Sequence, residues 1–164
     1  MNKEGHVLNA VLLGVGLGFI LEPSGTLATL RVVVVVIVPV TLGALFPDVD
    51  TAFGKHRKTL HNLPILAGFV AFPLVFGNLA YVWIGVLTHY VLDVLGSTRG
   101  IALFYPLWSE EFGFPAGVAT SSKYANVVTL VVTAIELATA AAIVHVLPQY
   151  VDVAALQDVA AVLP

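Results

Sequence analysis

Residues 27–46 read LATLRVVVVVIVPVTLGALF, an apolar run with a single charged residue, Arg31. The β-branched stretch within it, Val32 to Val38, would favour a buried strand in a water-soluble protein. A helix needs ~17–25 predominantly apolar residues to cross a lipid bilayer, and this run is long enough. We therefore expect residues 27–46 to form a transmembrane helix.

The composition of the whole chain also indicates a membrane protein. Of its 164 residues, 59% are hydrophobic and only 10% are charged, and the mean hydropathy is +0.97. Soluble domains are about 45–50% apolar and about 25% charged, so this chain could not cover a soluble surface without large apolar patches. The net charge of −3 argues against nucleic acid as a partner. The absence of cysteine excludes disulfides, thiolate metal ligands and cysteine nucleophiles.

Five apolar segments are expected to span the membrane, which predicts an all-α, multi-pass helical bundle in a single domain, residues 1–147. The approximate spans are 6–21, 27–46, 62–77, 79–95 and 124–147. The aromatic-rich segment 97–122 is expected to lie in the membrane interface before the last span. Residues 148–164 are expected to form an acidic tail.

Two local signals refine this arrangement. The turn Gly77-Asn78 predicts that the third and fourth spans form an antiparallel hairpin. The first span could be mistaken for a signal peptide, because a lysine precedes its apolar run. However, Glu22-Pro23-Ser24 follows it in place of a small-residue cleavage site, so we expect the first span to be retained.

The basic residues predict the orientation of the bundle. If five spans alternate, every lysine and arginine except Arg31 falls on one side: Lys3, Lys55, Arg57, Lys58, Arg99 and Lys123. The positive-inside rule places this side in the cytoplasm. We therefore expect a protein of the inner (cytoplasmic) membrane, with its N-terminus in the cytoplasm and its C-terminus outside.

The same topology brings histidines and aspartates from four helix ends to the inner membrane face. They are His6, Asp48, Asp50, His56, His61, His89 and Asp93. His89 and Asp93 are four residues apart on one helix, so their side chains share a face and can hold one ion. Ionisable groups within a span are costly and usually functional. The alternative for this pair is a His–Asp hydrogen bond that only joins helices.

These residue types predict a metal site. Histidine and carboxylate ligands without thiolates suit Zn²⁺, with Mn²⁺ or Fe²⁺ as alternatives, and the number of ligands allows one or two ions. The expected ligands are His6, Asp48, Asp50, His61, His89 and Asp93. Asp50 is also a candidate catalytic base, or a residue that orients a histidine. His56 and Asn62 are candidates for supporting the ligands.

Two further ionisable residues, Arg57 and Glu136, lie outside the expected set of ligands. Arg57 is a candidate catalytic residue, because its planar guanidinium can bind a phosphate or carboxylate in bidentate fashion. Its alternative is a plain positive-inside charge. Glu136 is near the middle of the last span, where a carboxylate is costly, and is expected to lie too deep to join the site.

The order of these motifs resembles the YdjM-type family of membrane-bound, metal-dependent hydrolases. The resemblance covers residues 5 to about 115, and the matching residues are Gly5-His6, Pro47-Asp48-Val49-Asp50, His56-Arg57, His61, Gly85, His89, Asp93, Gly100 and Pro106. Lys58 replaces a glycine, Thr59 is displaced by one position, and Asn62 stands where serine is common. These departures leave the expected ligands intact and could alter the substrate pocket. The resemblance implies an inner-membrane protein distantly similar to zinc-dependent phospholipases.

Together, the motifs and the resemblance predict a membrane-embedded metal-dependent hydrolase acting at the inner membrane face. The membrane lipid is then both the environment and a possible substrate, attacked at a lipid ester or phosphoester by a metal-activated water. One alternative is a non-enzymatic metal-binding or metal-transporting membrane protein. Another is a metal-independent lipid-phosphate phosphatase, whose last motif resembles HYVLDVLG at residues 89–96, although that family's Pro-Ser-Gly-His motif is absent.

Overall fold

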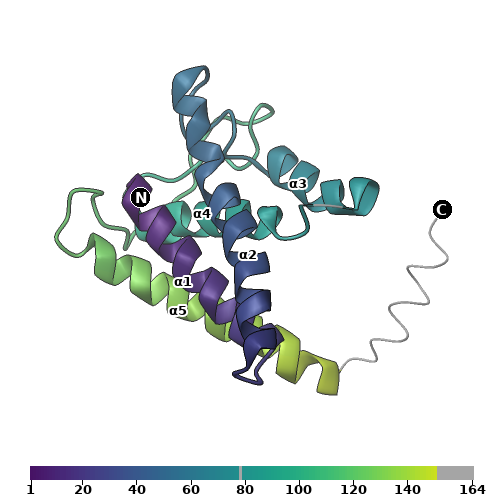
Figure 1. Cartoon of the computed structure of the whole chain (residues 1–164). Coiled ribbons are helices and arrows are strands. Elements are labelled where there is room, and N and C mark those ends of the chain that lie inside the picture. The colour runs from purple at the N-terminus through teal and green to yellow at the C-terminus, as the bar shows by residue number, and fades with distance from the viewer. Residues whose placement is uncertain (78, 151–164) are drawn as a thin grey trace.

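The computed structural model describes residues 1–77 and 79–150, and it confirms the all-helical membrane bundle (Figure 1). Apart from two isolated bridges, this part of the chain contains no β-structure. Its five α-helices are α1 (Lys3–Leu21), α2 (Leu27–Leu45), α3 (Leu63–Phe76), α4 (Val82–Gly96) and α5 (Ala125–Ala141). Shorter helical turns follow α2 and α5: η1 (Pro47–Ala52), η2 (Ala142–Val146) and η3 (Leu147–Gln149). Asn78 of the expected hairpin turn and residues 151–164 of the expected acidic tail lie outside the described residues.

Three helical stretches are long and apolar enough to cross a membrane: Lys3–Leu21, Leu27–Ala52 and Ala125–Gln149. The other two helices, α3 and α4, are apolar but have only 14 and 15 residues. At about 1.5 Å per residue they are roughly 21 and 22 Å long, whereas the hydrocarbon core of a bilayer is about 30 Å thick. Both are thus shorter than the spans 62–77 and 79–95 that hydropathy predicts.

Capping residues explain the short length of α3. The Asn62 side chain accepts a hydrogen bond from the Ile65 backbone N–H and so begins the helix. Gly77 ends it in the left-handed conformation, with φ of 68°. Figure 1 shows α3 at the periphery, beside α4, and α3 has no buried residue. The capping residues act on the backbone, and a hydropathy pattern does not register them.

Glycines allow α1 and α2 to pack closely. A Cβ added at Gly14 would lie 2.7 Å from the Cα of Ile37, and one at Gly18 would lie 2.8 Å from the Cα of Val33. Lipid gives no hydrophobic drive for helices to associate, so close backbone contact through small residues matters more than in water. The two glycines, four residues apart, form the face of α1 that receives α2.

A still closer crossing joins α2 to α4. A Cβ at Gly43 would lie 2.0 Å from the Val82 carbonyl oxygen, and one at Gly85 would lie 2.0 Å from the Val40 carbonyl oxygen. The two backbones therefore touch at this crossing. His89 follows Gly85 by about one helical turn, so the crossing holds the end of α4 that carries His89 close to the end of α2.

The segment between α4 and α5 contains no α-helix, as expected for the loop before the last span. It folds back on the end of α4, where the Phe114 N–H donates to the Val94 carbonyl at 2.7 Å. Three of its aromatic rings, Phe104, Trp108 and Phe112, contact each other with centroid distances of 5.4 to 6.2 Å. The loop thus covers the end of α4 that carries the candidate site.

Candidate metal centre

The centre of the site is a contact between His61 and His89, whose Nε2 atoms lie 3.0 Å apart. Both side chains are fully buried. His61 Nδ1 lies 3.0 Å from a carboxylate oxygen of Asp50, and His89 Nδ1 lies 2.7 Å from the Ala44 carbonyl oxygen. Since these oxygens only accept, each Nδ1 carries a proton and donates it. In the neutral imidazole, each Nε2 is then an acceptor, and two lone pairs face each other.

Two carboxylate oxygens lie around this pair. Asp48 Oδ1 is 3.7 Å from the Nε2 of both histidines. Asp93 Oδ2 is 3.7 Å from His89 Nε2 and 3.9 Å from His61 Nε2. These separations exceed the ~2.7–3.2 Å of an N–H···O hydrogen bond. They are near the ~3.3 Å between neighbouring ligands of a tetrahedral ion that binds nitrogen and oxygen at about 2.0–2.1 Å.

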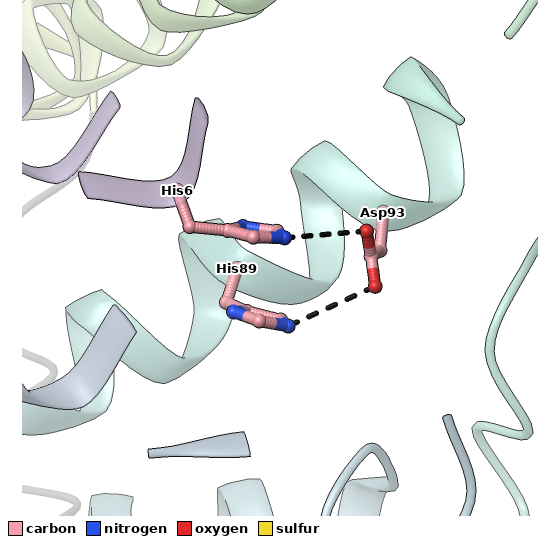
Figure 2. A group of neighbouring side chains, drawn as sticks. All are labelled: His6, His89 and Asp93. Atoms are coloured by element: carbon pink, nitrogen blue, oxygen red, sulfur yellow. Dashed lines mark ion pairs between the residues drawn. The ribbon is translucent and has the colours of Figure 1, made fainter. Parts of the chain in front are cut away.

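His6 contributes a third buried histidine from α1. Its ring stacks on that of His89, with centroids 3.7 Å apart and an angle of 8° between the rings. Figure 2 shows that both rings turn a nitrogen toward Asp93. His6 Nε2 lies 3.4 Å from Asp93 Oδ1, which also contacts the amino nitrogen of Met1. Within the described residues, neither ring nitrogen of His6 has a hydrogen-bond partner.

These observations fit a divalent cation. His6, His89 and Asp93 bring ligand atoms within 4.8 Å of one another, and Asp48, His56 and His61 do the same. The contact between His61 and His89 joins the two groups. A cation would satisfy the facing lone pairs, and it would offset the charge of the nearby carboxylates. The orphaned nitrogens of His6 point to the same need, because an unpaired buried polar atom costs about 1–3 kcal/mol.

Asp50 lies behind the ligands. It is fully buried, and it accepts hydrogen bonds from His61 Nδ1 at Oδ2 and from His56 Nδ1 at Oδ1, the latter at 2.9 Å. The Leu60 N–H donates to it at 3.4 Å. The side chain expected as ligand or base therefore has both oxygens turned to histidine Nδ1 atoms. The His56 side chain is 41% exposed, so it lies at the rim of the site.

Two other expected site residues lie outside the ring of ligand atoms. Asn62 caps α3, and its Nδ2 donates to the carbonyls of Lys58 and Thr59 at 2.8 and 3.0 Å. It therefore shapes the loop that carries His61. Arg57 is buried, and its Nη1 donates to oxygens of the loop after α4 instead of reaching the histidines.

A comparison with protein-family models supplies the family. Residues 1–159 match the family described as YdjM inner membrane protein. The chain belongs to the YdjM family. The match covers nearly the whole chain, including every residue of the candidate metal centre, and it confirms the resemblance predicted from the motifs. A search of curated proteins and a search of solved structures each found no match.

Sequence reasoning overlooked Tyr90 in the YdjM motif HYVLD. Its hydroxyl donates to the Leu60 carbonyl at 2.6 Å and accepts from the Asn62 N–H at 3.2 Å. It therefore ties α4 to the backbone on either side of His61 and sets the distance between His61 and His89. Its position next to His89 indicated a role at the site. However, an aromatic residue in a helix usually only packs against its neighbours, so the sequence alone did not single it out.

A second polar cluster lies next to the histidines and joins α1, α4 and α5 of this YdjM protein. Thr88 Oγ1 is 2.5 Å from Asn9 Oδ1 and 2.6 Å from Glu136 Oε1. Asn9 Nδ2 donates to Glu136 Oε2 at 2.7 Å and to Thr133 Oγ1 at 2.9 Å. One hydroxyl proton of Thr88 cannot serve two oxygens, so the network is complete only when the Glu136 carboxyl supplies another proton. Glu136 thus supports the helices that carry His6 and His89.

Proposed function

We propose that this protein is a membrane-embedded, metal-dependent hydrolase that acts at the inner membrane face on a lipid ester or phosphoester. The observation that supports it most is the pair of facing Nε2 atoms of His61 and His89. A direct hydrogen bond between them would require one imidazolium. A shared divalent ion instead satisfies both lone pairs and neutralises charge on Asp48 and Asp93.

The proposed ligands are Asp48, His61, His89 and Asp93. His6 would add a fifth ligand, or it would hold a second ion together with Asp93, whose two oxygens face different histidines. Nitrogen and oxygen ligands without thiolates favour Zn²⁺, with Mn²⁺ or Fe²⁺ as alternatives. Such an ion, when bound, supplies a Lewis acid that polarises an ester or phosphoryl oxygen and makes water a better nucleophile.

The residues around the ligands have distinct proposed roles. Asp50 is a positioning residue, because it holds the Nδ1 protons of His56 and His61 and so fixes both tautomers. His56 is the proposed general acid–base, since it is part-exposed and its Nε2 has no hydrogen-bond partner within the described residues. That nitrogen can take a proton from water and return it to a leaving group. Arg57 would bind the anionic part of the substrate.

The location at a membrane face is supported by the ends of the helices. His6 is in the first turns of α1, Asp48 follows α2, and Asp93 is in the last turn of α4. The ligands therefore gather at one end of the bundle. The neighbouring loop exposes Leu107 and Trp108, which are 97% and 51% accessible. Exposed apolar and aromatic side chains of this kind suit contact with lipid.

Metal analysis followed by activity assays tests the proposal. Full-length protein purified in detergent should hold a stoichiometric transition metal and hydrolyse a member of a panel of phospholipids and phosphoesters. Chelation should abolish turnover, and Zn²⁺ should restore it. His89→Ala and Asp93→Ala should each lose the metal, whereas His145→Ala, which changes an exposed histidine on η2, should retain it. A metal-free wild type, or unchanged metal content in both site variants, would refute the hydrolase.

The same preparation separates the alternatives. Hydrolysis that survives chelation would indicate a metal-independent phosphatase. Metal flux into liposomes without any turnover would indicate a transport protein.

A further inference from the structure

A cavity of about 420 Å³ opens beside the metal centre. Its volume falls within the ~300–1,000 Å³ of small-molecule sites. His56, Arg57 and Arg99 line it, together with Ser97, Thr98 and Thr120. His56 also contacts Asp50, so this one side chain borders both the cavity and the metal centre. A group bound in the cavity would therefore lie next to the proposed ligands.

Arg57 carries a buried charge without a counter-ion. Its exposed fraction is 7%, and no carboxylate of the described residues lies within ion-pair distance of it. Its contacts are neutral oxygens: Nη1 donates to Ser97 Oγ at 3.2 Å, the Arg99 carbonyl at 2.6 Å and the Gly100 carbonyl at 3.2 Å. Buried charges in proteins are normally paired, because a buried charge loses its hydration and needs the attraction of an opposite charge to compensate.

The free donors of Arg57 match an oxyanion. Nη1 is occupied by three oxygens, whereas Nε and Nη2 have no acceptor among residues 1–77 and 79–150. These two nitrogens form the planar fork that binds two oxygens of one phosphate or carboxylate group. Arg99 does not compete for this role, because Glu111 already neutralises it through contacts of 2.9 to 3.2 Å.

The backbone of Arg57 is in a strained conformation. Its φ is 67°, a left-handed conformation that is unusual for a residue with a Cβ. The Ala102 N–H donates to the Arg57 carbonyl at 2.9 Å, which fastens this turn to the loop after α4. Strained backbone of this kind persists where the surrounding structure enforces it, often at functional sites. The turn thus places the guanidinium of Arg57 at the cavity.

The cavity also offers hydroxyl donors. Thr98 and Thr120 line it and are exposed, and within the described chain neither hydroxyl takes part in a hydrogen bond. A phosphate has three or four oxygens to satisfy, and donors beyond the plane of one guanidinium suit it better than they suit a planar carboxylate.

We propose that this cavity binds a phosphate group, with Arg57 as its central contact and the two threonine hydroxyls beside it. The group is either the phosphate of a lipid headgroup or free phosphate, since both present the same oxygens. Its assignment to the substrate rests on the proposed hydrolase function and narrows that function to phosphate-bearing substrates. Phosphate binding itself does not depend on turnover.

Calorimetry on the detergent-purified, full-length chain tests the proposal. The probes are inorganic phosphate, short-chain phosphatidic acid and short-chain diacylglycerol, which lacks the phosphate. Binding of phosphatidic acid alone would identify a lipid source, and binding of both phosphate compounds would identify the shared group. Arg57→Gln should weaken the binding at least about tenfold, and Arg57→Lys should not restore it, because a point charge lacks the fork. Arg31→Gln, which removes an exposed arginine from α2, should bind as the wild type does.

A measurement on the wild type covers the case in which the Arg57 variants do not fold. Inorganic phosphate or short-chain phosphatidic acid should slow the modification of Arg57 by phenylglyoxal, measured by peptide mass spectrometry, and should leave Arg31 unaffected. Equal modification of Arg57 with and without each of the two phosphate compounds would overturn the proposal, as would binding by Arg57→Gln at wild-type strength. Metal content measured in the same samples keeps the two ideas apart. A metal-loaded protein without Arg57-dependent binding refutes only the phosphate site, and a metal-free protein that binds phosphate refutes only the hydrolase.

Discussion

His61 Nε2 and His89 Nε2 lie 3.0 Å apart, although one residue is in the loop before α3 and the other is within α4. Each nitrogen is turned to the other because its ring is held from behind, by Asp50 in one case and by the Ala44 carbonyl in the other. This arrangement costs energy unless a cation lies between the two rings.

Asp48→Ala and Asp50→Asn should weaken metal binding to different extents. Asp48→Ala removes a proposed ligand oxygen, so it should lose stoichiometric metal. Asp50→Asn replaces one of the two oxygens that accept from His56 and His61 by an N–H donor, so one histidine loses the acceptor that orients it. Loss of such a partner typically changes metal affinity by about 10–100-fold. Competition with a chromophoric chelator measures both affinities. Equal affinity of Asp50→Asn and the wild type would rule out the orienting role.

His56→Gln should retain the metal and lose turnover. His56 is at the rim of the site and is assigned to proton transfer, a role usually worth about 10²–10⁴-fold in rate. The expected result is a lower kcat with unchanged metal content. Lys55→Gln, which changes the preceding exposed residue, serves as the control. Loss of the metal in His56→Gln would instead make His56 a ligand.

Gly85→Ala should destabilise the protein and disturb the metal centre. An added Cβ would lie 2.0 Å from the Val40 carbonyl oxygen, so α2 and α4 would have to separate. Overpacking of this kind costs about 1–3 kcal/mol. Gly68→Ala on α3 is the matched control, because its Cβ would meet no atom within 4 Å. Thermal unfolding in detergent compares the two, and similar stability of both variants would contradict the close crossing.

Glu136→Gln should be tolerated, whereas Glu136→Leu should not. A glutamine amide can donate where the protonated carboxyl of Glu136 donates, so the contacts to Asn9 and Thr88 survive. Leucine would leave one Asn9 N–H without an acceptor, although Asn9 would still donate to Thr133 and Thr88 would still donate to Asn9. An unsatisfied buried group costs about 1–3 kcal/mol. The free energies of unfolding measure the difference. A Glu136→Gln variant as unstable as Glu136→Leu would show that the carboxyl is ionised.

Removal of the metal should lower the unfolding temperature. An ion that binds only the folded state stabilises it by about 2.7 kcal/mol when its free concentration is 100 times its Kd. Unfolding with and without a chelator should therefore differ in the wild type. The His89→Ala variant should not respond to the chelator, and an equal response of both proteins would place the metal elsewhere.

The sequence by itself determined the class of fold and the residue types of the site. Hydropathy and charge content are sums over the chain, so they predict a helical membrane bundle without knowledge of its packing. The spacing of His89 and Asp93 predicts that they share a helix face, because four residues make about one turn. The motif order also predicted the YdjM family, which the family comparison confirmed.

Only the tertiary structure decided which atom of each side chain faces which partner. The stacking of His6 on His89 depends on how α1 and α4 lie together, and the place of Asp50 behind His61 depends on the turn after α2. The lone charge of Arg57 depends on a loop that closes over it from beyond α4. Contacts between residues far apart in sequence are set by helix crossings such as that of Gly43 and Gly85. A local pattern carries no record of these crossings, because their cause is the fit between two separate surfaces.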